Sequence, residues 1–267
     1  MGSEVMVIEL KNKNRIYGEL KYNQENFQNF SKHSHETLNI VAIKKEQIAI
    51  EYHKQTIHYL KPKQLAIFNP KQVHLTSKQS HTAIPYYSLH LHSDWSLALQ
   101  NELFENSRFF PLTPNIITDL NLSNTFLEIC SKILNKNTSE IEKELSDFAK
   151  KLFMQYANRK IKFHHNHTLE KVEQYILQNI DKNLNLKEIA KEFGYTSAHL
   201  NRLFKEEYGL TLHAFLIDKR IEKAKRLISR NKKATLTEIA YEAGFFDQSH
   251  FIRNFKRVYS LSPKKYK

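Results

Sequence analysis

Two short segments of the chain, about fifty residues apart, carry polar side chains at matching positions of a helical period. The residues on this polar side are Ala198, Asn201, Arg202 and Lys205 in the first segment, and Gln248, Ser249, Arg253 and Lys256 in the second. Arginine can donate two hydrogen bonds to guanine, and asparagine or glutamine can pair with adenine. The two segments therefore have the side chains needed to read base edges in a major groove of DNA.

These segments are the two copies of an internal repeat. Glu188, Ile189, Ala190 and Gly194 recur 50 residues later as Glu238, Ile239, Ala240 and Gly244, and His199, Arg202, Phe204 and Lys205 recur 51 residues later as His250, Arg253, Phe255 and Lys256. The alternative interpretation is that the polar faces are ordinary solvent-exposed helix faces of an all-α domain. Packing alone, however, does not require outward-facing residues to recur. The repeat therefore favours a shared binding role for the two polar faces.

Each copy of the repeat predicts two helices joined by a tight turn, which positions the second helix. The residues able to cap these helices are Asn185 with Glu188, Thr235 with Glu238, then Thr196 or Ser197, and Asp247. Gly194 and Gly244 tolerate a positive φ, which ends the first helix and turns the chain. This is the pattern of a helix-turn-helix unit.

Between the two copies, regularly spaced apolar residues from Leu212 to Ile228 predict one long amphipathic helix. About 18 residues at ~1.5 Å each span ~27 Å. Successive major-groove faces of a duplex are ~34 Å apart. One chain could therefore place both polar helices on the same side of a DNA duplex.

The composition favours an anionic partner outside a membrane. Lysine and arginine number 41 against 28 acidic residues, and residues 165–267 carry eight of the 13 net positive charges. No window approaches the ~20 apolar residues of a membrane span, and no signal segment is visible at the N-terminus. The single Cys130 cannot form an internal disulfide. We therefore expect a cytoplasmic protein that does not enter a membrane.

The N-terminal half has a different period from the repeat. Short alternating or β-rich runs occupy residues 5–10, 15–20, 37–43, 47–52, 65–68 and 84–92, and two apolar helical stripes follow at 122–134 and 141–153. We predict an α+β chain, in which a small antiparallel barrel or sandwich with two following helices precedes an all-α domain. The polar, basic segment 159–167 is the predicted linker, which separates domains 1–158 and 168–267.

From Thr168 onwards the chain resembles the AraC/XylS family of bacterial transcription regulators, whose DNA-binding domain has two helix-turn-helix units joined by a long helix. The strongest match is residues 243–267 (AGFFDQSHFIRNFKRVYSLSPKKYK), with Ser260 replacing a usual glycine. The resemblance implies base contacts at Ala198, Asn201 and Arg202 in the first unit, and at Gln248, Ser249, Ile252 and Arg253 in the second. It also implies RNA polymerase as a partner and activation as the mode of control.

The N-terminal half resembles the cupin-like sensor domain of many family members, through residues 30–38 (FSKHSHETL) and 60–74 (LKPKQLAIFNPKQVH). This resemblance implies that a small-molecule effector binds in the barrel and that helices between 122 and 156 form a homodimer. The apolar stripes of these helices could equally pack on their own barrel. By location, the candidate effector-binding residues are His33, His35, His74, Tyr86 and Trp95.

The histidines suggest a competing class, a metal-dependent oxygenase or isomerase. His33 and His35 are two residues apart and point to the same face of a strand, where His74 could complete a three-histidine site. Metal-binding cupins usually add a carboxylate three or four residues after the second histidine, but those positions hold Leu38 and Asn39. We therefore expect that the protein is not an enzyme and has no catalytic residue or cofactor. A structural or sensory metal at the histidines stays an alternative.

Two further groups have plain structural interpretations. His164, His165 and His167 could bind a metal, but a solvated linker is favoured because no other ligand is spaced nearby. Cys130 lies in an apolar helical stripe, which predicts a buried thiol and not a nucleophile. A protein that uses its basic face on a membrane or an acidic partner is a third class, but it does not explain the repeat.

Overall fold

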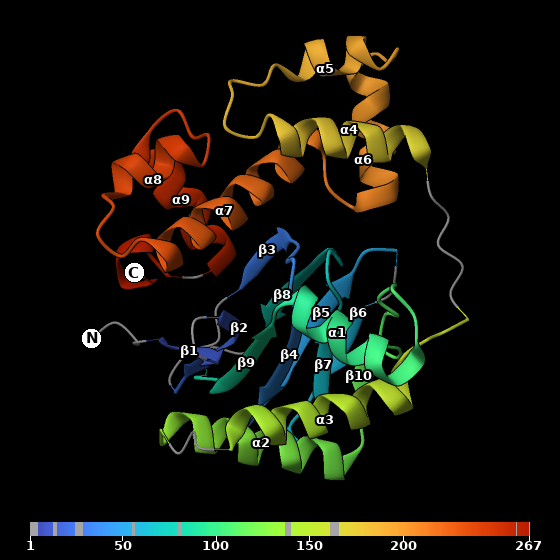
Figure 1. Ribbon diagram of the computed structural model, residues 1–267, viewed down its shortest axis with the longest axis vertical. Coiled ribbons are helices and arrows are strands. Elements are labelled where there is room, and N and C mark those ends of the chain that lie inside the picture. Colours follow the sequence, from blue (N-terminus) through green and yellow to red (C-terminus); the bar gives the residue numbers. More distant parts are fainter. Residues whose placement is uncertain are drawn as a thin grey trace.

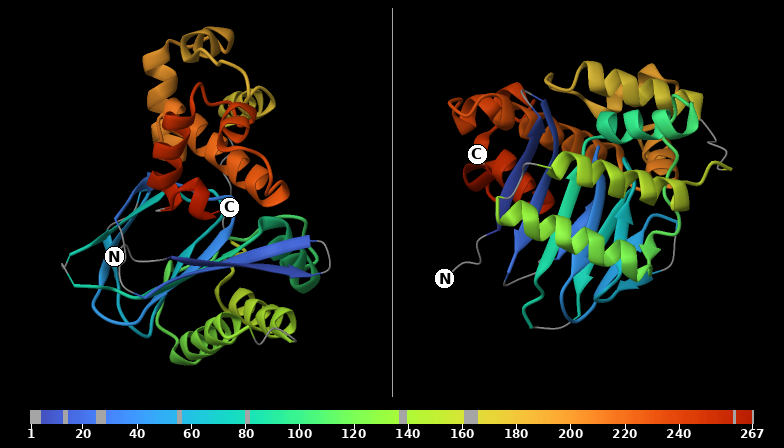
Figure 2. Two further views of the ribbon diagram at one scale, coloured as in Figure 1. Left: turned by 90° about the vertical axis from the view of Figure 1, so that its left-hand side faces the viewer. Right: turned by 60° about the horizontal axis from the view of Figure 1, so that its bottom comes forward.

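The computed structural model describes residues 5–12, 15–24, 29–54, 57–79, 82–136, 140–160, 166–259 and 261–266. Two antiparallel sheets form the N-terminal domain, and helices form the C-terminal domain (Figure 1). The C-terminal domain lies on one side of the sheets, and two helices lie on the opposite side (Figure 2). The predicted α+β class is confirmed, with the strands arranged as two facing sheets.

The larger sheet has six strands and the smaller has four. The order in the larger sheet is β1 (Met6–Asn12), β2 (Arg15–Asn23), β9 (Tyr86–Leu91), β4 (Leu38–Ile43), β7 (Leu65–Phe68) and β10 (Ile116–Ile117). The order in the smaller sheet is β3 (Phe30–His33), β8 (His74–Lys78), β5 (Ile48–Tyr52) and β6 (Ile57–Leu60). All pairings between these strands are antiparallel. The six predicted strands are present, whereas β3, β6, β8 and β10 were not predicted.

Alternation along β4 divides its side chains between two environments. Leu38 and Ile40 face the helices that cover the larger sheet, whereas Val41 and Ile43 belong to the core on the other side. These helices are α2 (Leu120–Leu134) and α3 (Ile141–Tyr156), as predicted. Their apolar stripes, including Phe126 and Cys130, are fully buried against the sheet. The stripes therefore pack within their own domain, and the homodimer stays a prediction from the family.

A further helix, α1 (Ser93–Phe104), was not predicted. Its fully buried positions are Ser96 and Gln100, whereas the apolar Trp95, Leu99 and Leu103 are only partly buried against the core. The Gln100 side chain donates to the carbonyl of Phe110 at 2.9 Å and accepts from its amide at 2.7 Å. The helix is therefore held by polar contacts of Gln100 together with partly buried apolar contacts.

The C-terminal domain contains two small cores joined by one long helix. Its helices are α4 (His167–Gln178), α5 (Leu186–Glu192), α6 (Ser197–Tyr208), α7 (Leu212–Arg230), α8 (Leu236–Glu242), α9 (Gln248–Tyr259) and α10 (Pro263–Tyr266). Leu200 and Phe204 of α6 pack in the first core, and Phe251 and Phe255 of α9 in the second. The two predicted helix-turn-helix units and the connecting helix are confirmed.

The predicted linker lies between α3, which ends at Tyr156, and α4, which begins at His167. His164, His165 and the departure at Ser260 lie outside the described residues. None of the helices in the described part of the chain is both long and apolar enough to cross a membrane.

Candidate nucleic-acid interface and histidine pocket

The turn of each helix-turn-helix unit depends on the predicted glycine. Gly194 has φ +75° and Gly244 has φ +90°, in the left-handed region that other residues rarely adopt. The following helices are capped by Thr196, which accepts from the amide of His199, and by Asp247, which accepts from His250 at 2.7 Å. These local signals set the direction in which α6 and α9 leave their turns.

The polar faces of α6 and α9 are solvent-accessible, as DNA contact requires. The exposed residues on these faces are Ala198, Arg202, Lys205, Gln248, Ser249, Arg253 and Lys256, whereas Asn201 and Ile252 are half-buried. Arg202 forms an ion pair with Glu206 at 3.4 Å, and both side chains are more than half exposed. Such a pair is worth little in water, so Arg202 can leave Glu206 to bind a base.

Both predicted readers with amide side chains, Asn201 and Gln248, have partners within the protein. The Asn201 side-chain oxygen accepts from the backbone amide of Leu212 at 3.0 Å, at the start of α7. Pairing with adenine uses both the oxygen and the nitrogen of an amide. Base reading by Asn201 would therefore compete with this cap. Gln248 accepts from the Thr237 hydroxyl at 2.6 Å, but both residues are exposed and this bond can exchange.

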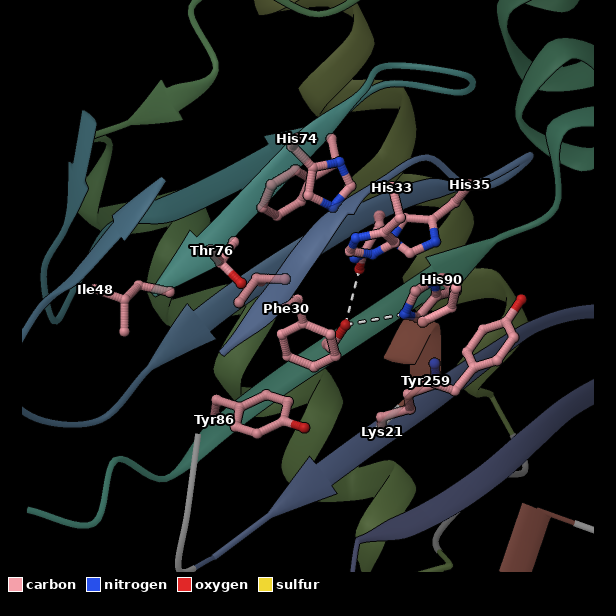
Figure 3. A pocket seen from close by; sticks show the side chains of 15 residues that line it. Lys21, Phe30, His33, His35, Ile48, His74, Thr76, Tyr86, His90 and Tyr259 are labelled. Carbon is pink, nitrogen blue, oxygen red and sulfur yellow. Dashed lines mark hydrogen bonds between the residues drawn. The ribbon is translucent and has the colours of Figure 1, made fainter. Parts of the chain in front are cut away.

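The inner face of α9 meets the N-terminal domain. Val258 and Tyr259 line a pocket that lies between the two sheets (Figure 3). The Lys21 ammonium of β2 lies 4.3 Å from the centre of the Tyr259 ring. The helix that carries Arg253 on its outer face therefore forms part of the pocket wall with its inner face.

Buried charges join the domains beside this pocket. Glu19 accepts hydrogen bonds from Lys225 of α7, at 2.9 Å, and from the Tyr266 hydroxyl, and it lies 3.6 Å from Lys21. Burial alone would raise the pKa of the Glu19 carboxyl, but Lys225 and Lys21 outweigh burial and hold it well below its usual value. Burial lowers the pKa of Lys21 to about 8. Glu19 is therefore an anion shared by both domains.

A second group of polar contacts lies next to the first. Asp218 of α7 accepts from the Ser34 amide at 3.2 Å and from Arg257 at 3.0 Å. Burial raises the pKa of Asp218 to about 7, although Arg257 opposes the shift. Lys219 forms an ion pair with Glu36, so the Glu36 carboxylate is directed to α7 and away from the histidines.

The pocket brings together four of the five predicted effector-binding residues. These are His33, His35, His74 and Tyr86. Trp95 does not line this pocket, because the chain enters α1 at Ser93 and Trp95 stacks on Tyr17 with ring centroids 5.6 Å apart. The structure adds Lys21, His90 and Tyr259, which sequence reasoning missed.

Strand alternation could have identified one of the missed residues. Tyr86, Ser88 and His90 alternate along β9 and share the face that lines the pocket, whereas Leu89 and Leu91 belong to the core on the opposite face. Lys21 and Tyr259 come to the pocket through sheet pairing and domain docking. Those two contacts leave no local signal in the sequence.

Burial favours the neutral form of the four pocket histidines. Burial lowers the pKa of His33, His35 and His90 well below the usual value, and that of His74 to about 4. The cavity between them has a volume of about 40 Å³. Pockets for drug-sized organic molecules usually have ~300–1,000 Å³. In this conformation the cavity fits water or a single ion.

Two family models match the chain. The model of the AraC-like ligand binding domain matches residues 16–150, and a helix-turn-helix domain model matches residues 189–267. The Transposon Tn10 TetD protein of Escherichia coli is 32% identical over 119 residues, which are 45% of this chain and 83% of that protein. The probable transcriptional regulator LumQ of Photobacterium leiognathi is 33% identical over 95 residues, or 36% of this chain and only 38% of LumQ.

Solved structures of ToxT from Vibrio cholerae share the fold of the whole chain. An apo variant has a TM-score of 0.63 at 17% identity, covering 96% of this chain and 98% of ToxT. Wild-type ToxT bound to an unsaturated fatty acid has a TM-score of 0.62 at 18% identity, covering 96% of both chains. The similarity includes the sheet domain and the helical domain together.

Proposed function

The chain belongs to the AraC-like family of helix-turn-helix regulators, and we propose that it is a cytoplasmic, sequence-specific DNA-binding regulator of transcription. The observation that carries the proposal is the pair of exposed arginines, Arg202 and Arg253, at matching positions of two helices with repeated caps and glycine turns. No catalytic step is part of the proposed function. RNA polymerase as a partner, and activation as the mode of control, stay predictions from the family.

The proposed readers are α6 and α9, each in one major groove. Arg202 and Arg253 donate to base edges, with Ser249, Ile252 and Gln248 beside Arg253. Lys205, Lys256 and the exposed Lys264 and Lys265 of α10 contact phosphates, which position the protein without reading sequence. The 19-residue helix α7 holds the two readers apart.

The proposed control acts through the position of α9. An effector changes DNA binding only if it binds two arrangements of the domains unequally. A ligand in the pocket touches Val258 and Tyr259 directly, so its binding energy depends on whether α9 stays against the sheets. ToxT has been solved with an unsaturated fatty acid; a ligand of that size would have to enlarge the cavity of about 40 Å³ found here.

The test is a selection of genomic fragments by the purified full-length protein, followed by footprinting of the most enriched fragment. We expect protection of two adjacent major grooves on one face of the duplex. Arg108→Ala, which removes an exposed arginine of the N-terminal domain, is the matched control and should leave the selected sequence unchanged. No enrichment over scrambled DNA would overturn the proposal.

A further inference from the structure

Three histidines of the pocket face one another from neighbouring segments of the smaller sheet. His33 ends β3, His74 begins β8, and His35 follows two residues after His33 (Figure 3). The ring centroids are 4.5 Å apart for His33 and His74, 4.7 Å for His33 and His35, and 5.0 Å for His35 and His74. One ring nitrogen from each lies within 4.8 Å of the others. Three imidazoles therefore share one small space.

Backbone hydrogen bonds fix which nitrogen two of these rings can offer. His33 Nδ1 donates to the carbonyl of Ser31 at 2.6 Å, and His74 Nδ1 donates to the carbonyl of Gln72 at 2.9 Å. A carbonyl can only accept, so Nδ1 carries the proton and Nε2 keeps its lone pair. This is how proteins orient metal-binding histidines, through a bond from the other ring nitrogen to a carbonyl.

The third histidine, His35, has a ring nitrogen without a hydrogen-bond partner among the described residues. This nitrogen, Nδ1, is buried. Leaving a buried ring nitrogen unpaired is costly, and an apolar side chain would fill the same space without that cost. The described residues that line the pocket include no carboxylate that could pair with these rings. Packing alone does not account for three polar rings here.

The nearby His90 differs from these three. Its Nδ1 lies 3.1 Å from the Thr37 hydroxyl and its Nε2 lies 3.0 Å from the Ser88 hydroxyl, so both nitrogens have partners within the protein. His90 is therefore not a ligand in this arrangement. The cavity volume of about 40 Å³ leaves room for an ion together with a water molecule.

We propose that His33, His35 and His74 bind one divalent transition-metal ion, with the fourth coordination position open to the cavity. Neutral imidazoles suit zinc, copper, nickel or iron and not magnesium or calcium, which prefer oxygen ligands. Bonds of ~2.0–2.1 Å to a tetrahedral ion place ligand nitrogens ~3.4 Å apart, whereas those of the three histidines lie within 4.8 Å of one another, so the rings move closer on binding. The missing carboxylate of cupin enzymes distinguishes this site from theirs.

The test is calorimetric titration of the EDTA-treated full-length protein with Zn²⁺. We expect one ion per chain, and a loss of affinity of about 100-fold or more in His35→Ala and in His74→Ala, at least as large as the loss of an outer-shell partner causes. His90→Gln is the matched buried control and should retain one tight site. Tight binding that survives His35→Ala and His74→Ala, or that is lost in His90→Gln, overturns the assignment.

A spectroscopic measurement guards against misfolded variants. Wild-type protein loaded with Co²⁺ should show the visible absorption of a four-coordinate ion with nitrogen ligands, and circular dichroism of the metal-free variants should match that of the wild type. Absence of both the Zn²⁺ heat and the Co²⁺ bands in folded wild-type protein overturns the site. The readout is metal binding alone, so it does not depend on whether the protein binds DNA.

Discussion

The two helix-turn-helix units are similar in sequence, but they dock on the N-terminal domain in different ways. The second unit, with α8 and α9, lies beside the buried Glu19 and Lys225 pair and forms part of the pocket wall. The first unit, with α5 and α6, docks together with the preceding α4 through Val73 and through polar contacts in which at least one partner is exposed. A repeat in the sequence therefore does not imply equal coupling to the sensor domain, because coupling depends on residues outside the repeat.

The contacts of the first unit show the contrast in detail. Lys71 forms an ion pair with Glu173 of α4 at 2.9 Å, in which the Lys71 side chain is 54% exposed and the Glu173 side chain 11% exposed. His53 Nε2 donates to the carbonyl of Glu206 at 3.0 Å, also at the surface. Exposed pairs contribute little, whereas a buried pair is expensive to break. We therefore expect the second unit to be the one held by the N-terminal domain.

The largest expected effect is that of Glu19→Gln. The substitution keeps the size of the side chain but removes the buried negative charge. Among the described residues, Glu19 is the ion-pair partner of both Lys225 and Lys21. We expect the free energy of unfolding to fall by ~3–5 kcal/mol, because an uncompensated buried cation is left behind. Urea denaturation measures the change. A loss below ~1 kcal/mol would mean that the second unit is not held by this cluster.

The glycine turns give a second comparison within the repeat. A Cβ added to Gly244 would lie 2.3 Å from the carbonyl oxygen of Ile180, whereas one added to Gly194 would meet nothing within 4 Å. In both alanine variants the left-handed backbone conformation lowers the free energy of unfolding by ~1–2 kcal/mol. Only Gly244→Ala adds a steric clash with the backbone. We expect Gly244→Ala to cost ~3 kcal/mol and Gly194→Ala ~1 kcal/mol, measured by thermal unfolding. Equal losses would show that the first turn is as confined as the second.

How far the sequence predicts the structure differs between the two halves. The helix-turn-helix units could be predicted because their caps, glycines and apolar periods are local, as Thr235 and Gly244 show. In the N-terminal half, β3 and β8 are short and carry polar residues, so they resemble loops. The spacing of His33 and His35 in the sequence is enough to predict that they lie together. The contact of Glu19 with Lys225, in contrast, joins residues 206 positions apart. Such a contact exists only after the domains dock.

The two reading helices, α6 and α9, should contribute equally to base discrimination even though they dock differently on the N-terminal domain. Arg253→Ala and Arg202→Ala should each reduce the preference for the selected operator over scrambled DNA by ~2 kcal/mol, since a good base contact contributes ~1–3 kcal/mol of discrimination. Fluorescence anisotropy on both DNAs measures this preference, with Arg108→Ala as the unaffected control. An equal loss on operator and scrambled DNA would instead assign the arginine to the phosphate backbone.

The smallest expected effect is that of Lys71→Ala, which removes the ion pair between the N-terminal domain and α4, the helix that packs on the first unit. Burial lowers the pKa of Lys71, but the hydrogen bond to Glu173 and nearby negative charges, including that of Glu173, together raise it more. The net effect is a raised pKa, which indicates attraction within the pair. Because the Lys71 ammonium is largely in solvent, screening limits the contribution of the pair to ~1 kcal/mol or less. Urea denaturation should therefore show a change below ~1 kcal/mol, which falls further in 0.5 M salt. If Lys71→Ala were as destabilising as Glu19→Gln, both units would be held equally by the N-terminal domain, and control through α9 alone would lose its physical basis.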